Sequence, residues 1–335
     1  MSAPERPRVA VVGTSHWHHK FYRETLARDA NIVGFSDPSA AKLKEVEPFY
    51  GNGGSLDWRE LLDPQLKLDA VMVMAPHDEM KEVSLEFIAR DVPLILEKPG
   101  GMSADEVKAI RDASIKRGVP IAVAFIQRAG NLWKSMQRVG QLDYATFLSQ
   151  SGPPERYINQ SPWALERAHS GGGSFINIAV HFIDLFLQAT HAEALTVQAQ
   201  AQARLSGPYD VEDRMTALVS TDDGVSAVFE IGYLFPPAPP HRYLAYTARG
   251  SEGFMSIDGS GDIAHTSMTG ETDVVNDNVD SGPLTSIFMR DAIAGIRNGF
   301  VGLAGVADLH RSMQVVDAAY ASAFEKRAVD VTIDW

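Results

Sequence analysis

RVAVVGTSHWHH, residues 8–19, is the stretch that decides the fold. An apolar run, Val9–Val12, ends at Gly13, and a segment with the spacing of a helix starts at His19. Such runs and helical segments alternate as far as Phe125, which is typical of a parallel sheet covered by helices. The expected strands are Val9–Val12, Ile32–Phe35, Ala70–Met74, Pro93–Leu96 and Ile121–Phe125, and the expected helices are His19–Arg28, Met80–Arg90 and Ala104–Arg117. These nearly continuous apolar strands predict a doubly wound α/β domain over residues 1–127.

The rest of the chain, residues 128–335, has a different pattern of apolar and polar residues. Five longer segments alternate apolar and polar residues, which predicts an antiparallel or mixed sheet. The segments are Leu195–Arg204, Arg214–Thr221, Val225–Tyr233, Tyr243–Ala248 and Phe254–Ile257. Apolar residues at intervals of three and four predict a long amphipathic helix over Leu309–Phe324. We therefore expect a second α/β domain.

The composition limits the class of function. The 335 residues contain 30 Lys and Arg against 43 Asp and Glu, a net charge of −13, so nucleic acid and anionic membranes are disfavoured as partners. Cysteine is absent from the sequence, which excludes disulfides and thiolate chemistry. The first residues leave no room for a secretory signal, and the apolar segment Phe175–Leu187 is too short and too polar to span a bilayer. A soluble, cytoplasmic protein is the expectation.

The turn after the first strand resembles a dinucleotide-binding loop only in part. The G-x-G-x-x-G pattern uses one glycine for the turn, one for approach to the pyrophosphate and one for helix packing. Gly13 matches the first, but Ser15 and His18 replace the other two. The histidines His16, His18 and His19 would suit a metal, yet no carboxylate cluster accompanies them, so we predict none.

Two strand ends carry polar residues where a parallel sheet binds ligands. Asp37 follows Gly13 by 24 residues, close to where an acidic residue binds the adenosine ribose, and the absence of a neighbouring arginine favours NAD over NADP. The alternative is an ordinary turn aspartate before Pro38. Glu97-Lys98-Pro99 follows the apolar run Pro93–Leu96, so Lys98 is placed to hold or deprotonate a substrate hydroxyl. The alternative is a solvated ion pair of Glu97 with Lys98.

A glycine triplet, residues 171–173, leads into the apolar segment Phe175–Leu187. Asn177, His181 and Asp184 follow at spacings of four and three, so in a helix they share one face. Buried polar groups need partners, and a substrate with several hydroxyls would supply them. The alternative is hydrogen bonding within the protein core.

These motifs together resemble the glucose-fructose oxidoreductase / inositol dehydrogenase family, Gfo/Idh/MocA, in order and spacing over nearly the whole chain. The resemblance rests on Gly13, Asp37, Ala75-Pro76-His77, Glu97-Lys98-Pro99, and Gly171–Gly173 with Asn177, His181 and Asp184. It implies an N-terminal Rossmann domain that binds NAD or NADP, of which the residues around Asp37 favour NAD. It also implies a C-terminal α/β domain with a large open sheet that mediates homodimers or homotetramers.

The resemblance further implies roles for single residues. Lys98 would position and activate the substrate hydroxyl, His181 would serve as general acid and base, and Asn177 would take a place often held by Asp. Asp184 would orient His181 or support the fold. The implied cofactor-binding residues are Gly13, Thr14, Ser15, His16, Asp37, Ala75, Pro76, His77, Glu97 and Lys98, and the implied substrate-binding residues are Lys98, Arg128, Trp163, Asn177 and His181.

The expected function is an NAD-dependent dehydrogenase for a secondary hydroxyl of a sugar, cyclitol or sugar derivative. Two alternatives follow from departures from the family pattern. Extra histidines in the first turn would suit a redox-neutral enzyme, such as a lyase or epimerase, that uses NAD transiently. Loss of the glycines at Ser15 and His18 would suit a sugar-binding protein that has lost the nucleotide.

Overall fold

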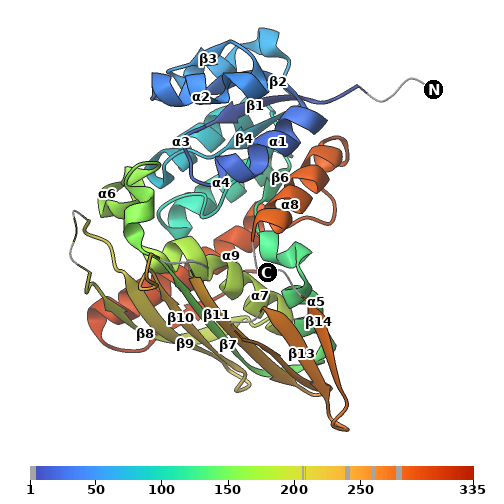
Figure 1. The fold of residues 1–335 in the computed structure, drawn as a ribbon, viewed down its shortest axis with the longest axis vertical. Coiled ribbons are helices and arrows are strands. Elements are labelled where there is room, and N and C mark those ends of the chain that lie inside the picture. The colour runs from blue at the N-terminus through green and yellow to red at the C-terminus, as the bar shows by residue number, and fades with distance from the viewer. Residues whose placement is uncertain (1–4, 206, 208, 238–241, 259–260, 277–280) are drawn as a thin grey trace. The chain divides into compact units, whose positions relative to one another are not determined.

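The computed structural model describes residues 5–205, 207, 209–237, 242–258, 261–276 and 281–335 (Figure 1). The chain divides into two compact units. The first comprises Met1–Ala124 with Gly282–Leu309, and the second comprises Phe125–Ser281 with His310–Trp335. The sequence analysis assigned all of 128–335 to the second domain, so the placement of Gly282–Leu309 differs from that expectation.

Contacts with the first sheet explain where Gly282–Leu309 lies. The Val123 N–H, in the last strand of that sheet, donates to the Ala304 carbonyl at 2.8 Å. In the middle of the segment, Arg297 donates to the Glu5 carbonyl at 2.8 Å. The returning segment thus packs along the first unit, which local sequence periodicity does not reveal.

The first unit is built on a parallel sheet, as predicted, with six strands where five were expected. Its strand order is β3-β2-β1-β4-β5-β6. The strands are β1 (Arg8–Val12), β2 (Asn31–Ser36), β3 (Gly54–Ser55), β4 (Ala70–Val73), β5 (Leu94–Leu96) and β6 (Ile121–Val123). The helices are α1 (His19–Asp29), α2 (Ala40–Tyr50), α3 (His77–Ile88), α4 (Ala104–Arg117) and α8 (Ser281–Gly295). The doubly wound fold is therefore confirmed.

Side-chain chemistry accounts for these elements. All residues of β4 and β5 are buried, as strands covered by helices on both faces must be. Helix α4 starts at the Ser103 cap, whose Oγ accepts from the Glu106 N–H at 3.4 Å, and ends at Gly118 in the left-handed region. Helix α2 was missed because Pro48 interrupts its pattern.

The second unit is built on a nine-stranded mixed sheet in the order β14-β13-β12-β11-β7-β10-β9-β8-β15. Its strands are β7 (Leu142–Ser151), β8 (Ala194–Gln202), β9 (Arg214–Thr221), β10 (Ser226–Gly232), β11 (Arg242–Gly250), β12 (Gly253–Ile257), β13 (Asp262–Ser267), β14 (Thr272–Asn276) and β15 (Val329–Thr332). Only β7 and β10 pair in parallel; the other pairs are antiparallel.

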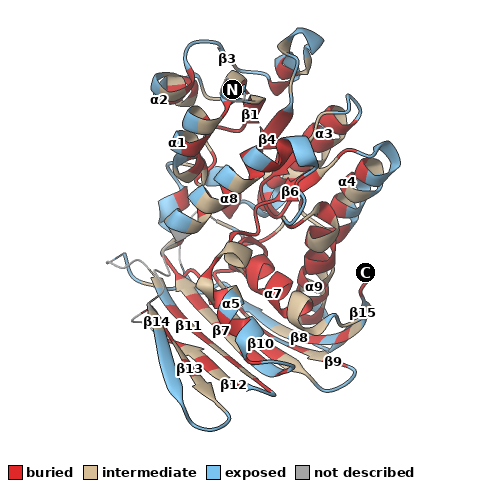
Figure 2. Cartoon of the chain, turned by 90° about the vertical axis from the view of Figure 1, so that its right-hand side faces the viewer, coloured by how far each residue is buried: buried red, intermediate tan, exposed pale blue. Residues whose placement is uncertain are grey.

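One face of this sheet is covered by helices (Figure 2). They include α5 (Asn131–Arg138), α7 (Val180–Thr190) and α9 (Val306–Glu325), and the short α6 (Arg167–Ser170) precedes α7. The helical segment Arg167–Thr190 is 24 residues long and contains an 18-residue window with a mean hydropathy of 1.2, so by length and composition it is long and apolar enough to cross a membrane. However, 83% of its apolar window is buried inside the protein, which is the position of a core helix.

Candidate active site

The cofactor-binding residues expected from the sequence lie at the carboxyl ends of the parallel strands. The turn Gly13–His16 follows β1, Asp37 follows β2, Ala75–His77 follows β4, and Glu97 with Lys98 follows β5. The strand order reverses between β1 and β4, and open α/β sheets bind their ligands at such a switch point. The structure therefore brings these residues to one edge of the first unit.

Gly13 is required by the close approach of two strand ends. Its φ is +86°, and a Cβ at this position would lie 2.4 Å from the Met74 carbonyl oxygen, just beyond β4. Its N–H donates to the Ser36 carbonyl at 2.9 Å. A side chain at residue 13 would force the β1 turn away from β2 and β4.

The groups around Gly13 fit a dinucleotide. Thr14 Oγ1 and Ser36 Oγ are buried hydroxyl oxygens without a hydrogen-bond partner among the described residues. Leaving such a group unsatisfied costs about 1–3 kcal/mol, which a ligand rich in hydroxyl and phosphate oxygens would offset. Asp37 is 2% exposed, and its carboxylate accepts from the Ser15 N–H at 2.6 Å and the Ser39 N–H at 2.9 Å. The fixed carboxylate is suited to ribose hydroxyls.

His18 occupies the third glycine position without blocking the fold. Its Nδ1 lies 2.8 Å from Glu97 Oε1, and the Tyr22 hydroxyl donates to Glu97 Oε2 at 2.8 Å. Glu97 is fully buried, so these donors replace the water that its carboxylate would otherwise bind. The imidazole that replaces the glycine links the start of α1 to the end of β5.

Aromatic rings line the same edge. The rings of His16 and Trp17 stack with centroids 4.0 Å apart, and Lys98 Nζ lies 5.8 Å from the Trp17 ring centre. Burial lowers the pKa of His16 well below its usual range, and His18 adds to this effect. Burial also raises the pKa of Glu97, against which the charge of Lys98 acts. Lys98 itself is 2% exposed, so the solvated ion pair considered from the sequence is excluded.

His19 does not belong to this edge. Its Nε2 lies 2.8 Å from the Tyr50 hydroxyl of α2, inside the core, and burial lowers its pKa to about 4. His77 begins α3 and is 1% exposed. Within the part of the chain that the structure describes, no three His, Asp or Glu side chains cluster as metal ligands.

In the second unit, the glycine triplet is held by a buried carboxylate. Glu212 accepts from the Gly173 and Phe175 N–H groups at 2.8 and 2.9 Å and from the Tyr320 hydroxyl of α9 at 2.9 Å. A Cβ on Gly173 would lie 2.0 Å from the Glu212 carbonyl oxygen. Burial raises the pKa of Glu212, and its hydrogen bonds oppose the rise. The sequence analysis missed Glu212, because a turn between strands gives no sign of burial.

Asn177 lies in a π-helical turn, Phe175–Ala179, which joins the triplet to α7. Its side-chain amide donates to the Tyr157 hydroxyl at 3.1 Å and the Tyr233 hydroxyl at 2.8 Å. Both tyrosines were missed. The two tyrosine hydroxyls therefore accept the amide hydrogens of Asn177, for which the sequence analysis expected a substrate. Such π-turns are frequent at functional sites.

Asp184 and Arg128 form an ion pair. The Arg128 Nε donates to Asp184 Oδ2 at 2.7 Å, and Nη2 donates to the second carboxylate oxygen. Asp184 is 1% exposed, so the buried ion pair holds α7 in place. It also gives Arg128 a partner within the protein, whereas Arg128 was expected from the sequence to bind substrate. The His181 ring packs edge-on against Phe125, with centroids 5.9 Å apart. Trp163 lies half-buried in the turn Pro162–Leu165.

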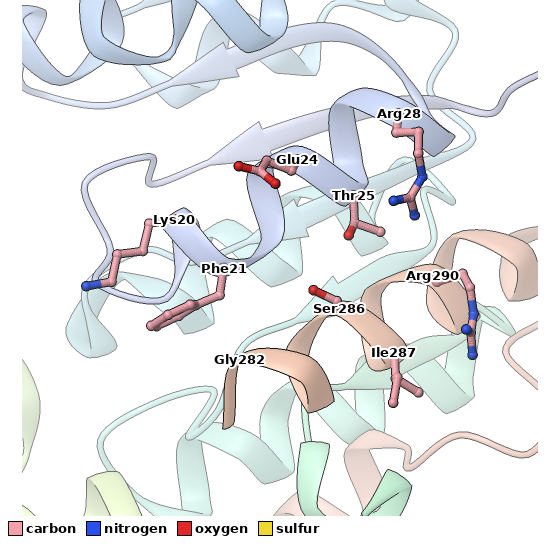
Figure 3. A pocket seen from close by; sticks show the side chains of 9 residues that line it. All are labelled: Lys20, Phe21, Glu24, Thr25, Arg28, Gly282, Ser286, Ile287 and Arg290. Atoms are coloured by element: carbon pink, nitrogen blue, oxygen red, sulfur yellow. The ribbon is translucent and has the colours of Figure 1, made fainter. Parts of the chain in front are cut away.

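A cavity of about 480 Å³ lies between α1 and α8 of the first unit (Figure 3). Its lining includes Lys20, Arg28 and Arg290. Arg28 donates twice to Asp29 at 2.8 and 2.6 Å, and Arg290 pairs with the adjacent Asp291. The guanidinium groups of Arg28 and Arg290 already have carboxylate partners. We therefore place the active site at the carboxyl ends of the parallel strands and not in this cavity.

Two family models match the chain. One is described as an oxidoreductase family with an NAD-binding Rossmann fold and matches residues 7–125. The other is described as the GFO/IDH/MocA C-terminal domain and matches residues 136–255. Together they cover more than half of the chain.

Similar curated proteins include an inositol 2-dehydrogenase from Rhizobium meliloti, 21% identical, covering 90% of this chain and 92% of that protein. A scyllo-inositol 2-dehydrogenase (NAD(+)) from Bacillus subtilis is 25% identical, with 78% and 76% covered. The solved levoglucosan dehydrogenase complex with NADH and levoglucosan has a TM-score of 0.85 at 17% identity, covering 98% of this chain and all of that one. An oxidoreductase from Agrobacterium radiobacter in complex with NAD+, L-tartaric acid and magnesium has a TM-score of 0.80 at 18% identity, with 97% and 98% covered.

Proposed function

The chain belongs to the GFO/IDH/MocA oxidoreductase family, and we propose that it oxidises a secondary hydroxyl of a sugar, cyclitol or sugar derivative with NAD. The observation that carries this proposal is the carboxyl-terminal edge of the first sheet. It holds the buried Lys98 after β5, and near β1 and β2 it holds two unsatisfied hydroxyls and a fixed carboxylate. Named relatives that act on inositols support the substrate class.

The first unit supplies the cofactor site of this proposal. When bound, NAD accepts the hydride that leaves the substrate carbon. The turn Gly13–His16 would lie against the pyrophosphate, to which the unsatisfied Thr14 hydroxyl would donate, and Asp37 would bind the adenosine ribose. Ala75, Pro76 and His77 line the remainder of the site, and Glu97 fixes the end of β5.

Lys98 and His181 act on the substrate hydroxyl. Lys98 holds the hydroxyl oxygen and stabilises the negative charge that develops as its proton leaves. His181 accepts that proton in oxidation and returns it in reduction. Asn177 contacts a second hydroxyl of the substrate and is held in place by Tyr157 and Tyr233. Trp163 packs against the sugar ring, and Arg128 contributes indirectly by securing α7.

A panel of inositols, anhydrosugars and aldoses tests this proposal. The purified protein should reduce NAD with at least one of them. Lys98→Met should still bind NAD, measured by calorimetry, and lose turnover by about 100-fold or more. Arg59→Met, which changes an exposed cation of the same unit, serves as the control. Sugar binding without NAD binding would instead support a non-enzymatic role.

A second copy of this chain is the partner we propose. On the sheet face turned away from the helices, Tyr144, Leu218, Val228 and Tyr243 are between 37% and 43% exposed, and Val228 pairs directly with Leu218. These side chains come from the four neighbouring strands β11, β7, β10 and β9, so burying them requires a broad partner surface. Sedimentation should show a dimer or tetramer, and Val228→Glu should dissociate it. A wild-type monomer at all concentrations would contradict this assignment.

The proposed location is the cytoplasm, where a dehydrogenase has access to the cell's pool of NAD. The net charge of −13 disfavours binding to nucleic acid and to anionic membranes.

A further inference from the structure

We propose that Glu212 and Tyr320 are positioning residues, which hold the π-helical turn Phe175–Ala179 so that the Asn177 side chain keeps one position for the substrate. The inference concerns two residues that no motif of the sequence singled out as part of the site. Its importance for turnover rests on the substrate-binding role proposed for Asn177. The hydrogen bonds themselves lie within the second unit and are tested without substrate.

Glu212 binds three backbone N–H groups at the start of the turn. Its carboxylate accepts from Gly173 at 2.8 Å and from Phe175 at 2.9 Å, and its main-chain carbonyl accepts from Ser174 at 3.2 Å. Glu212 is 3% exposed, so water does not replace a donor that is lost. Breaking one of these bonds therefore leaves a buried carboxylate less satisfied, which makes the bonds hard to break.

Tyr320 binds the next N–H group along the chain. Its hydroxyl oxygen accepts from the Ile176 N–H at 3.3 Å, while its proton is donated to Glu212 at 2.9 Å. A Cβ on Gly172 would lie 2.1 Å from this hydroxyl oxygen, so the second glycine of the triplet is required by Tyr320. The N–H groups of residues 173–176 are thus bound by two elements, the segment before β9 and the helix α9, immediately before Asn177.

The same segment before β9 also fixes an acceptor of the Asn177 amide. The carbonyl of Asp213, next to Glu212, accepts from the Tyr233 N–H at 2.7 Å. The Tyr233 hydroxyl accepts from the Asn177 amide at 2.8 Å and donates to the Gly173 carbonyl at 3.3 Å. The hydrogen bonds therefore form a closed circuit from Glu212 through the triplet and Asn177 to Tyr233 and back. Polar networks connected in this way favour a single arrangement.

The π-helical turn determines where two proposed site residues lie. Asn177 lies within the turn, and His181 lies one helical turn later in α7. The i→i+5 bonding of a π-helical turn inserts one residue relative to an α-helix. A return to α-helical bonding would rotate Asn177 relative to His181 without unfolding α7. Weakening the contacts of Glu212 and Tyr320 should therefore impair substrate binding before it unfolds the second unit.

The test compares Tyr320→Phe with Ser322→Ala, a matched control on the same helix. Tyr320→Phe removes the hydroxyl that joins α9 to the π-helical turn. Ser322 is fully buried, and its hydroxyl accepts from the Ala199 N–H of β8 at 2.9 Å and donates to the Arg327 carbonyl at 2.6 Å. Ser322→Ala therefore removes a buried hydroxyl of α9 that does not bind the glycine triplet.

Tyr320→Phe should raise the KM for the sugar or cyclitol about 10-fold, as expected when one well-placed hydrogen bond is lost. Its dissociation constant for NAD should not change, because the first unit is unaltered. Amide hydrogen exchange should become faster over residues 173–177 in this variant. Ser322→Ala should lower the melting temperature without either change. Glu212→Gln, whose amide nitrogen cannot accept from an N–H group, should show the pattern of Tyr320→Phe more strongly.

Three results would overturn the inference. One is an unchanged KM in Tyr320→Phe, and another is unchanged exchange over residues 173–177. The third is an equal response in Ser322→Ala, because general destabilisation would then be the cause. If the exchange responds as expected but the wild-type protein oxidises no sugar or cyclitol, the positioning of the turn stands and the proposed function fails.

Discussion

Replacing Arg128 with methionine should destabilise the second unit, because the carboxylate that Arg128 pairs with is buried. Asp184 is 1% exposed, and both of its oxygens accept from the guanidinium. Removing one partner of a buried ion pair typically costs about 3–5 kcal/mol. The Arg128 side chain is 22% exposed, so we expect the lower end, about 3 kcal/mol.

A double-mutant cycle measures this prediction. Urea unfolding is recorded for wild type, Arg128→Met, Asp184→Leu and the double variant, and hydrogen exchange of α7 locates the effect. The double variant should be more stable than Arg128→Met, because the unpaired charge is then absent. If Arg128→Met changes the free energy of unfolding by less than about 1 kcal/mol while weakening substrate binding, Arg128 is a substrate ligand and the structural argument is refuted.

Three further outcomes follow from buried groups. The pKa of His19 is lowered from 6.5 to about 4 by burial. The free energy of unfolding that this shift contributes, about 3 kcal/mol, is present above pH 6.5 and is lost as the pH falls toward 4. In pH-dependent denaturation, His19→Gln should therefore lose less stability between pH 6.5 and pH 4. Gly13→Ala should abolish NAD binding in calorimetry and lower the melting temperature more than Gly118→Ala, which also has positive φ but open space around it. Tyr320→Phe should cost about 2 kcal/mol in urea unfolding, since Glu212 loses a donor; an unchanged midpoint would show that this bond is dispensable.

Strand periodicity predicted the first unit because its strands are buried on both faces. Val9–Val12 and Ala70–Met74 are continuous apolar runs, and a parallel sheet is the structure that buries them. The two-residue strand Gly54–Ser55 was missed because it is too short for any period to appear. The placement of Gly282–Leu309 was missed because packing of a late segment against an early sheet depends on distant contacts.

The site residues at the ends of parallel strands could be predicted from the sequence. The residues that form hydrogen bonds with other site residues could not. Asp37 and Lys98 were found because the carboxyl ends of parallel strands meet at one edge. The partners of Asn177 were not found, because Tyr157 and Tyr233 are brought to it by loops and strands far away in the chain. Glu212 was not found either, because the sequence does not show that its carboxylate is buried against the glycine triplet.

The central claim is that the bound substrate gives a hydride to NAD. A substrate carrying deuterium on the reacting carbon, incubated with the protein and NAD, tests it directly by mass spectrometry of the nucleotide. The account predicts that the reduced nucleotide carries the label in wild type and that labelled nucleotide is not formed with Lys98→Met. Label that stays in the sugar product while no reduced nucleotide accumulates, or label that is lost to water, would contradict net dehydrogenation.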